Sequence, residues 1–210
     1  MIKKNLKTMI LTSIVTLLPM LVGLLLWNRL PETIATHFGA NGEADGWSSK
    51  EFAVIGLPCM MLGFQWLTVA IVGADPKSQN ISDKMFTLIA WIMPVVAVFS
   101  CSSVYLYEFN NSFNVETISF ILIGFMFLIV GNYLPKMKQS YTLGIKLPWT
   151  LNSTENWNRT HRMASWIWII CGVLVLVAGF IGLEGIVIAA AAAAALIPCV
   201  YSYILYKKGI

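Results

Sequence analysis

Two polar segments of this chain carry the residues whose types could do chemistry. The first reads NRLPETIATHFGANGEADGWSSK (28–50) and holds four candidate residues: His37, Phe38, Asp45 and Trp47. A His–Asp pair could act as a general acid–base couple, but no Ser or Cys nucleophile is adjacent to it and the segment has no second His. Because its glycines favour tight turns, the segment could be a structured cap, a recognition surface for an extracellular ligand or, as a third alternative, a catalytic site.

The second segment, GNYLPKMKQSYTLGIKLPWTLNSTENWNRTHR (131–162), is the longest polar stretch of the sequence. Its glycine and two prolines predict an irregular path over residues 135–148, because these residues interrupt helices. Asn152 has Glu155 three residues later, which resembles a capping box. We therefore expect a helix that begins at Asn152 and runs into the next apolar stretch.

This expected helix would carry four residues along one face. Steps of four, three and four residues place on that face Trp157, His161, Ala164 and Trp168. Arg159 and Arg162 then lie on other faces, where they could meet lipid headgroups. The alternatives are a docking site for a cytoplasmic partner and contact with the floor of a helix bundle.

The elements that must position these residues are membrane-spanning helices. The chain is 58% hydrophobic and 11% charged, whereas soluble domains carry about 25% charged residues. Its mean hydropathy is +0.74. A helix needs about 20 apolar residues to cross a bilayer, and six apolar runs of about this length cover residues 9–27, 52–73, 85–107, 117–134, 165–182 and 186–206.

These runs predict an all-α integral membrane protein with six transmembrane helices. Alternating strands of about ten residues, the pattern of an outer-membrane barrel, are absent from the sequence. We expect one membrane domain over residues 1–210, with a loop at 28–51 on one side and a loop at 135–164 on the other.

The basic residues predict the orientation in the membrane. With the amino terminus in the cytoplasm, twelve of the 14 Lys and Arg residues fall on cytoplasmic segments, and only Arg29 and Lys50 lie outside. This is the positive-inside distribution, so we expect both termini in the cytoplasm and an uncleaved first span. The net charge of +4 then reflects membrane orientation, and we expect no direct contact with nucleic acid.

Other ionisable and metal-binding groups are sparse. The six apolar runs contain no Asp, Glu, Lys or Arg, and such residues usually mark ion pathways, so a proton-coupled transporter is disfavoured. His37 and His161 lie on opposite sides of the membrane under this topology and cannot share a metal ion. We therefore expect no catalytic residue, no metal and no cofactor. Four cysteines without CxxC spacing fall within the runs: Cys59, Cys101, Cys171 and Cys199.

Both polar segments resemble the SdpI family of bacterial membrane proteins. The second segment is similar to the family pattern GNYLPKxKxNxxxGIRxPWTLxxxxxWxxTHR, and LPETIATHFGANGEADGWSSK is similar to LPxxIPxHFxxxGxxDGWxxK, an amino-terminal domain often found in the same proteins. Three residues depart from these patterns: Ser140 replaces Asn, Lys146 replaces Arg and Ala35 replaces Pro. Lysine lacks the planar guanidinium with which arginine forms two parallel hydrogen bonds. Binding of a carboxylate or phosphate at position 146 would therefore be weaker here.

The resemblance implies a function. The family is named for an immunity protein that protects a bacterium from its own secreted peptide toxin and is described as holding an autorepressor at the membrane when toxin is present. By this resemblance the outer segment would meet toxin through His37, Phe38, Asp45 and Trp47. Contacts with a small repressor protein in the cytoplasm, or support of the fold, would rest on the inner motif: Asn132, Lys146, Pro148, Trp149, Thr150, Trp157, His161 and Arg162.

We therefore expect a multi-pass immunity or resistance protein of the bacterial inner membrane, embedded in the lipid bilayer. The alternative is a membrane enzyme or lipid-binding protein that acts on cell-envelope lipids, with substrate against His37 and Asp45 or against Lys146, Arg159 and Arg162. The two hypotheses differ in their response to mutation. Catalysis should fail when a single His or Asp is replaced, whereas peptide recognition should decline gradually over several loop residues.

Overall fold

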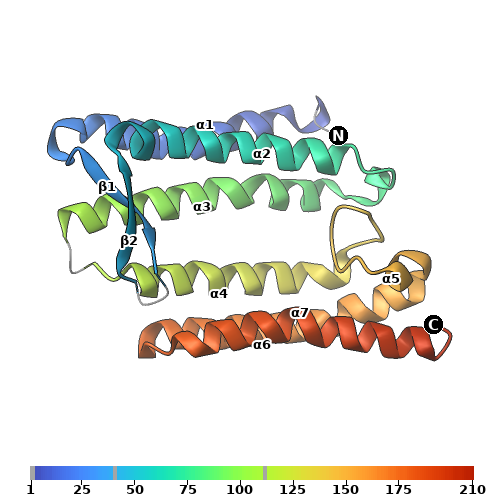
Figure 1. Cartoon of the computed structure of the whole chain (residues 1–210). Coiled ribbons are helices and arrows are strands. Elements are labelled where there is room, and N and C mark those ends of the chain that lie inside the picture. Colours follow the sequence, from blue (N-terminus) through green and yellow to red (C-terminus); the bar gives the residue numbers. More distant parts are fainter. Residues whose placement is uncertain (1–2, 40–41, 111–112) are drawn as a thin grey trace. The chain divides into compact units, whose positions relative to one another are not determined.

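The computed structural model describes residues 3–39, 42–110 and 113–210. Within these ranges six helices are long and apolar enough to cross a membrane, which confirms the predicted six-helix membrane fold. The six helices, drawn in Figure 1, are α1 (Leu6–Leu25), α2 (Leu57–Gly73), α3 (Asp83–Phe109), α4 (Val115–Tyr133), α6 (Thr154–Ile181) and α7 (Glu184–Lys207). A short helix, α5 (Pro148–Asn152), precedes α6, and a π-helical turn, Phe52–Gly56, precedes α2.

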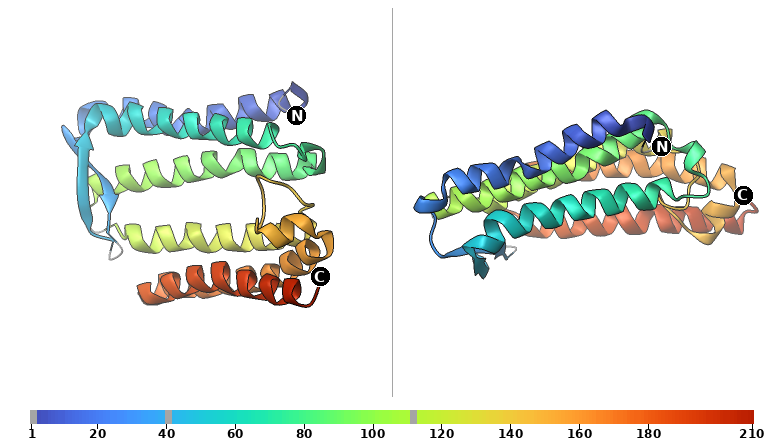
Figure 2. Two further views of the ribbon diagram at one scale, coloured as in Figure 1. Left: turned by 45° about the vertical axis from the view of Figure 1, so that its right-hand side comes forward. Right: turned by 90° about the horizontal axis from the view of Figure 1, so that it is seen from above.

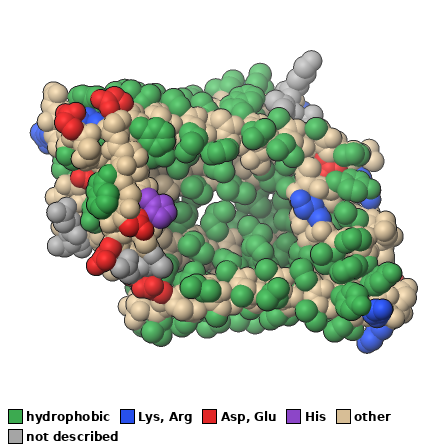
Figure 3. All heavy atoms as spheres, in the orientation of Figure 1, with side chains coloured by type: hydrophobic (Ala, Val, Ile, Leu, Met, Phe, Trp, Pro, Cys, Tyr) green, Lys and Arg blue, Asp and Glu red, His purple; other side chains and the backbone are tan. Residues whose placement is uncertain are grey.

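The surfaces of these helices suit a lipid environment. Hydrophobic side chains cover the lengths of the helices, and charged side chains gather near the helix ends (Figure 3). Large apolar residues on several helices are about half exposed, among them Leu21, Leu67, Ile170 and Val200. Such exposure is unfavourable in water and favourable against acyl chains, so these faces are lipid-facing.

The chain divides into two compact units. The first comprises Met1–Gly73 and Phe86–Ile118, and the second comprises Ala74–Met85 and Ser119–Ile210. The polar segment 28–50 therefore belongs to the first unit and the polar segment 131–162 to the second.

In the first unit α1, α2 and α3 lie side by side (Figure 2). Buried polar side chains connect two of these helices. Gln65 of α2 donates its Nε2 to Thr12 Oγ1 at 2.7 Å and accepts from Thr16 Oγ1 at 2.6 Å. A buried amide is stable in a membrane only when its polar atoms are paired, so these bonds fix α1 against α2.

The polar segment of the first unit folds into a β-hairpin, which is an element that the sequence patterns did not indicate. Strands β1 (Thr33–Phe38) and β2 (Ala44–Ser49) pair antiparallel, with irregular register between Ala35 and Phe38. Strand β2, ADGWSS, contains Ala, Asp and Gly, which are poor strand formers. Pairing and anchoring to the helices therefore outweigh local propensity here.

In the second unit α4, α6 and α7 lie side by side (Figure 2). Two glycines let α4 and α6 approach closely: a Cβ atom on Gly172 would lie 2.9 Å from the carbonyl oxygen of Gly124. Small residues at helix crossings are typical of membrane proteins. On α7, Ala190 and Ala194 are buried against α6, and the indole Nε1 of Trp168 donates to the carbonyl of Ala194 at 3.0 Å.

The start of α6 differs from the expected one. Asn152 is the last residue of α5, and Ser153 is the N-cap, whose hydroxyl accepts the N–H of Asn156 at 3.1 Å. The expected N-cap at Asn152 is therefore wrong by one residue. The physical reason is the short helix α5, which continues to Asn152 and leaves Ser153 as the first extended residue with a suitable side chain.

Candidate functional site

The hairpin carries the four residues expected to recognise a ligand. His37 Nδ1 and Asp45 Oδ1 form a hydrogen bond, with 75% and 53% of the two side chains exposed. Trp47 is 61% exposed. Phe38 is half-buried and packs edge-on against Tyr107 of α3, with the ring centroids 5.0 Å apart. Three of the four side chains are therefore accessible, and Phe38 anchors the hairpin to its unit.

Two polar contacts brace the hairpin against the helices. Lys50 is 5% exposed, and its Nζ donates to Glu32 Oε1 at 2.8 Å while lying 5.3 Å from the centre of the Trp27 ring. On β1, the backbone N–H of Ala35 donates to Glu108 Oε1 of α3 at 2.8 Å. A buried charge is tolerated only when paired, so Lys50 fixes the base of the hairpin. These contacts hold the strands that carry His37, Asp45 and Trp47.

The signature loop, residues 137–147, is held by a carboxylate that sequence reasoning missed. Asp75 lies between α2 and α3 and is 4% exposed. Its Oδ2 accepts the N–H of Tyr141 at 2.9 Å, the N–H of Thr142 at 2.8 Å and the Thr142 hydroxyl at 2.7 Å. Its Oδ1 accepts the N–H of Lys77 at 2.7 Å. Four donors thus converge on one side chain.

These donors determine the ionisation of Asp75. Burial by itself raises the pKa of a carboxyl group because it disfavours the charged form. The hydrogen bonds from Thr142, Lys77 and Ser140 outweigh this effect and hold the pKa of Asp75 below its usual range. The ionised carboxylate is therefore the form that organises the signature loop at neutral pH.

Gln139 joins the loop to two other segments. Its Nε2 donates to the backbone carbonyls of Thr150 and Leu151, both at 2.8 Å, and its Oε1 accepts from Lys77 Nζ. Its own carbonyl accepts from Asn80 Nδ2 at 2.7 Å. One glutamine therefore connects α5, the signature loop and the connection before α3.

Trp157 and His161 are buried beneath the signature loop and contact it. They are 0% and 1% exposed, and their rings stack with centroids 4.0 Å apart. Trp157 Nε1 donates to the Met137 carbonyl at 2.8 Å, and the Ile145 N–H donates to His161 Nε2 at 2.9 Å. Because Nε2 accepts, the proton lies on Nδ1, 2.8 Å from the Trp157 carbonyl, and the ring is neutral. Both ring nitrogens are engaged, so His161 acts as a structural residue.

Gly144 allows this close packing. Its φ of +95° is a conformation that other residues rarely adopt. A Cβ atom there would collide with His161 Nε2 and lie 2.9 Å from the Trp157 ring. The glycine of the motif is therefore explained by backbone geometry.

The short helix α5 is capped by Thr150 and displays Trp149. Thr150 Oγ1 accepts the Leu147 N–H and donates to the Ile145 carbonyl, both at 2.8 Å. Trp149 stacks on Tyr206 of α7, with centroids 5.6 Å apart. Its buried Nε1–H contacts no acceptor in the described part of the chain. A cavity of about 490 Å³ lies beside it, lined by Pro148, Trp149, Asn152, Ser153, Tyr206, Gly209 and Ile210.

Asn156 ties α6 to α7. Its Nδ2 donates to the carbonyls of Ser202 and Ile210 at 3.1 and 3.0 Å, and its Oδ1 accepts from Ser202 Oγ at 2.6 Å and Thr160 Oγ1 at 3.1 Å. All four residues sit in the second unit. This saturated amide is part of the scaffold, and no sequence pattern distinguishes Asn156 from the neighbouring asparagines.

The remaining residues of the predicted inner motif lie on the surface. Asn132, Lys146, Pro148 and Arg162 are exposed. Lys146 Nζ donates to the Thr142 carbonyl at 3.2 Å, and Arg162 lines a second cavity on α6 and α7. The predicted motif therefore divides into a buried scaffold of Thr150, Trp157 and His161 and an exposed surface. Among the described residues, no group of three or more His, Cys, Asp or Glu side chains could hold a metal ion.

Comparison with known proteins shows what the chain is similar to. Residues 136–202 match the model of the SdpI/YfhL protein family, and residues 14–62 match a domain of unknown function (DUF1648). Over 98% of its length the chain is 27% identical to "Immunity protein SdpI" of Bacillus subtilis (strain 168), of which 97% is covered. Over residues 136–202 the chain is therefore similar to the SdpI/YfhL family. It is a multi-pass protein of the cell membrane. No solved structure matches this chain.

The structure explains two departures from the family patterns. Ser140 Oγ accepts the N–H groups of Thr142 and Leu143 at 3.2 and 2.9 Å, which is the turn that an Asn side chain also makes. Ala35 has a backbone N–H bonded to Glu108, which a proline would lack. In this protein Ser140 therefore preserves the turn, and Ala35 adds a contact.

Proposed function

We propose that this protein is a membrane immunity protein that protects its cell from a secreted peptide toxin by binding rather than by catalysis. The observation that carries this proposal is the full-length likeness to the immunity protein SdpI, which covers 98% of this chain and 97% of the relative. A match of this extent includes both the hairpin segment and the inner motif. It therefore supports a shared role more strongly than a match to one motif does.

The proposed toxin-binding surface is the outer face of the hairpin, with His37, Asp45 and Trp47 as its accessible residues. Trp side chains are common anchors of binding energy, because a large rigid ring buries apolar area at low entropic cost. The His37–Asp45 hydrogen bond holds the two polar side chains in one geometry. Since Lys50 and Glu108 brace the hairpin, little conformational entropy would be lost on binding.

The proposed orientation places the hairpin outside the cell. Three of the six membrane-spanning helices, α2, α3 and α4, separate the hairpin from the signature loop along the chain. An odd number of crossings puts the two on opposite membrane faces. The positive-inside rule then assigns the Lys- and Arg-rich signature loop and both termini to the cytoplasm.

We propose a second, cytoplasmic role for the surface around Trp149, as the site that holds a small repressor protein. Trp149 forms an aromatic group with Tyr203 and Tyr206, which are 44% and 52% exposed. The cavity of about 490 Å³ beside this aromatic group is a place where an apolar side chain of a partner would pack. Toxin can drive such signalling only if it binds two conformations with unequal affinity.

Site-specific photo-crosslinking tests the proposal. A photoreactive phenylalanine analogue replaces Trp47, and in a matched control it replaces Tyr206 on the opposite membrane face. Cells that express either variant receive a synthetic SDP-type peptide toxin before illumination. We expect an adduct of toxin mass at position 47 and none at position 206. A toxin adduct at position 206 and none at position 47, in cells that remain protected, would exclude the hairpin as the binding surface.

A further inference from the structure

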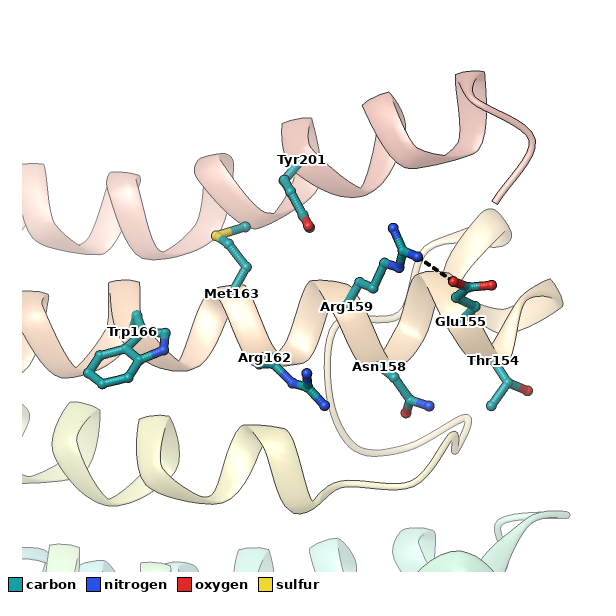
Figure 4. Close-up of a pocket in the computed structure, with 8 residues that line it drawn as sticks. All are labelled: Thr154, Glu155, Asn158, Arg159, Arg162, Met163, Trp166 and Tyr201. Carbon is teal, nitrogen blue, oxygen red and sulfur yellow. Dashed lines mark hydrogen bonds and ion pairs between the residues drawn. The ribbon is translucent and has the colours of Figure 1, made fainter.

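Four residues on α6 form a row, and only Arg162 among them belongs to the predicted inner motif. Thr154, Asn158, Arg162 and Trp166 recur at intervals of four, which places them along one ridge of a helix, and all four are exposed. Figure 4 shows that the side chains of Thr154, Asn158 and Arg162 point to the same side of α6. The row offers a hydroxyl, an amide, a guanidinium and an indole in succession.

This row borders a cavity of about 780 Å³ between the surfaces of α6 and α7. The volume lies within the usual range for sites that bind small molecules, about 300–1,000 Å³. Its other lining residues are Glu155, Arg159, Met163 and Tyr201. The cavity thus joins charged groups at one end to apolar and aromatic groups at the other.

The charges in the cavity leave one cation unpaired. Arg159 Nη2 is hydrogen-bonded to Glu155 Oε1, as the dashed line in Figure 4 shows. This pair neutralises itself. Arg162 has no acidic partner in the described ranges, and its guanidinium is therefore free to bind an anion. Arginine binds phosphate oxygens through two parallel hydrogen bonds.

The depth of Arg162 matches that of lipid headgroups. Trp side chains concentrate at the membrane–water interface, and beyond Trp166 the exposed face of α6 is apolar, with Ile170, Val173 and Leu174. Arg162 lies four residues before Trp166, which is about 6 Å closer to water along the helix. Phosphate groups of phospholipids occupy this layer.

We propose that this cavity binds the phosphodiester headgroup of an anionic phospholipid. Arg162 contacts the phosphate, Asn158 and Thr154 donate hydrogen bonds to it, and Met163 and Trp166 contact the upper part of the acyl chains. Glu155 is already bonded to Arg159, so the amine of a zwitterionic headgroup finds no free carboxylate here. The site therefore prefers phosphatidylglycerol over phosphatidylethanolamine, and it binds lipid whether or not a toxin is present.

Native mass spectrometry of the full-length protein in detergent tests this proposal. The protein is titrated in separate arms with phosphatidylglycerol and with phosphatidylethanolamine, and a third arm adds inorganic phosphate to the phosphatidylglycerol complex. Arg162→Gln removes the proposed contact. The matched control is Lys84→Gln, which removes an exposed positive charge in the first turn of α3, away from the cavity. Unfolding temperatures of all three proteins establish that they remain folded.

We expect wild type and Lys84→Gln to retain phosphatidylglycerol, and Arg162→Gln to bind it about tenfold more weakly, since a hydrogen bond to a charged group is lost. Phosphatidylethanolamine should bind wild type more weakly than phosphatidylglycerol. Equal retention of phosphatidylglycerol by wild type and Arg162→Gln would overturn the proposed lipid site. Displacement of lipid by millimolar inorganic phosphate would assign the cavity to free phosphate and overturn the lipid assignment.

Discussion

At the scale of single residues, the signature loop is organised by polar groups that are used internally. Asp75, Gln139 and Asn156 each form several hydrogen bonds with backbone atoms. His161 also bonds to backbone atoms, through both ring nitrogens. The sequence predicted that Trp157 and His161 share one helical face because their spacing is helical, and the structure buries both side chains. It could not predict Asp75, because a lone Asp between two spans is typical of any short connection.

Gly144→Ala tests the backbone explanation of the motif. We expect it to destabilise the protein by about 1–3 kcal/mol, because alanine is strained at positive φ and its Cβ would collide with His161. Thermal unfolding in detergent measures the change. Gly185→Ala is the matched control, since its Cβ would meet no atom within 4 Å and alanine favours a helix. An unfolding temperature for Gly144→Ala at or above that of the control would refute the explanation.

Asp75→Asn tests the role of the carboxylate through its pH dependence. The folded-state pKa of Asp75 is lowered, so its contribution to stability is fully present above the unfolded-state pKa of about 3.9 and is lost as the pH falls through the folded value. We expect wild type to unfold at a higher temperature than Asp75→Asn near neutral pH. The difference between the two unfolding temperatures should stay constant down to about pH 5 and become smaller below about pH 4. If this difference did not change with pH across this window, the charge of the Asp75 carboxylate would not be what stabilises the signature loop.

At the scale of elements, the long helices follow from apolar runs, whereas the hairpin depends on tertiary contacts. Each apolar run of about 20 residues specifies a helix, because lipid cannot pair free backbone groups. Strand β2 has low strand propensity and is held through pairing with β1, through Lys50 and Glu32, and through Phe38 against Tyr107. The contacts of Lys50 with Glu32 and of Phe38 with Tyr107 join residues far apart in sequence, so the sequence alone left open a structured cap, a recognition surface or a catalytic site.

Ala35→Pro tests the attachment of β1 to α3. The family pattern has proline at this position, yet here the substitution would remove the N–H that Glu108 accepts. We expect a loss of about 1–3 kcal/mol, because a partly buried carboxylate loses a donor. The unfolding temperature measures this loss. In a Glu108→Ala background the same substitution should cost much less, and an equal cost in both backgrounds would exclude this contact as the cause.

At the scale of the whole molecule, six spans and the charge distribution predict the orientation, while the recognition function rests on family likeness. Composition and apolar runs define a multi-pass membrane protein without further information. The division of the inner motif into a scaffold and an exposed surface depends on the packing of residues far apart in sequence, such as Asp75 and Thr142. Spacing alone does not encode that division.

Thiol labelling in intact cells tests the orientation. A cysteine introduced at Ser49 on the hairpin should react with a membrane-impermeant maleimide from outside, and one at Asn158 on α6 should react only after the cells are permeabilised. Wild type, whose four cysteines lie in membrane-spanning helices, provides the background. Labelling of Asn158→Cys but not of Ser49→Cys in intact cells would show the opposite orientation, with the hairpin in the cytoplasm.

The most direct test of the central claim is survival of a sensitive bacterium that expresses this protein while synthetic SDP-type peptide toxin is titrated. Wild type should raise the toxin concentration that halves survival, and His37→Ala and Trp47→Ala should each reduce that protection at unchanged membrane abundance. Thr33→Ala, at the base of the hairpin, is the control that should retain it. No protection from well-expressed wild type would contradict the immunity function.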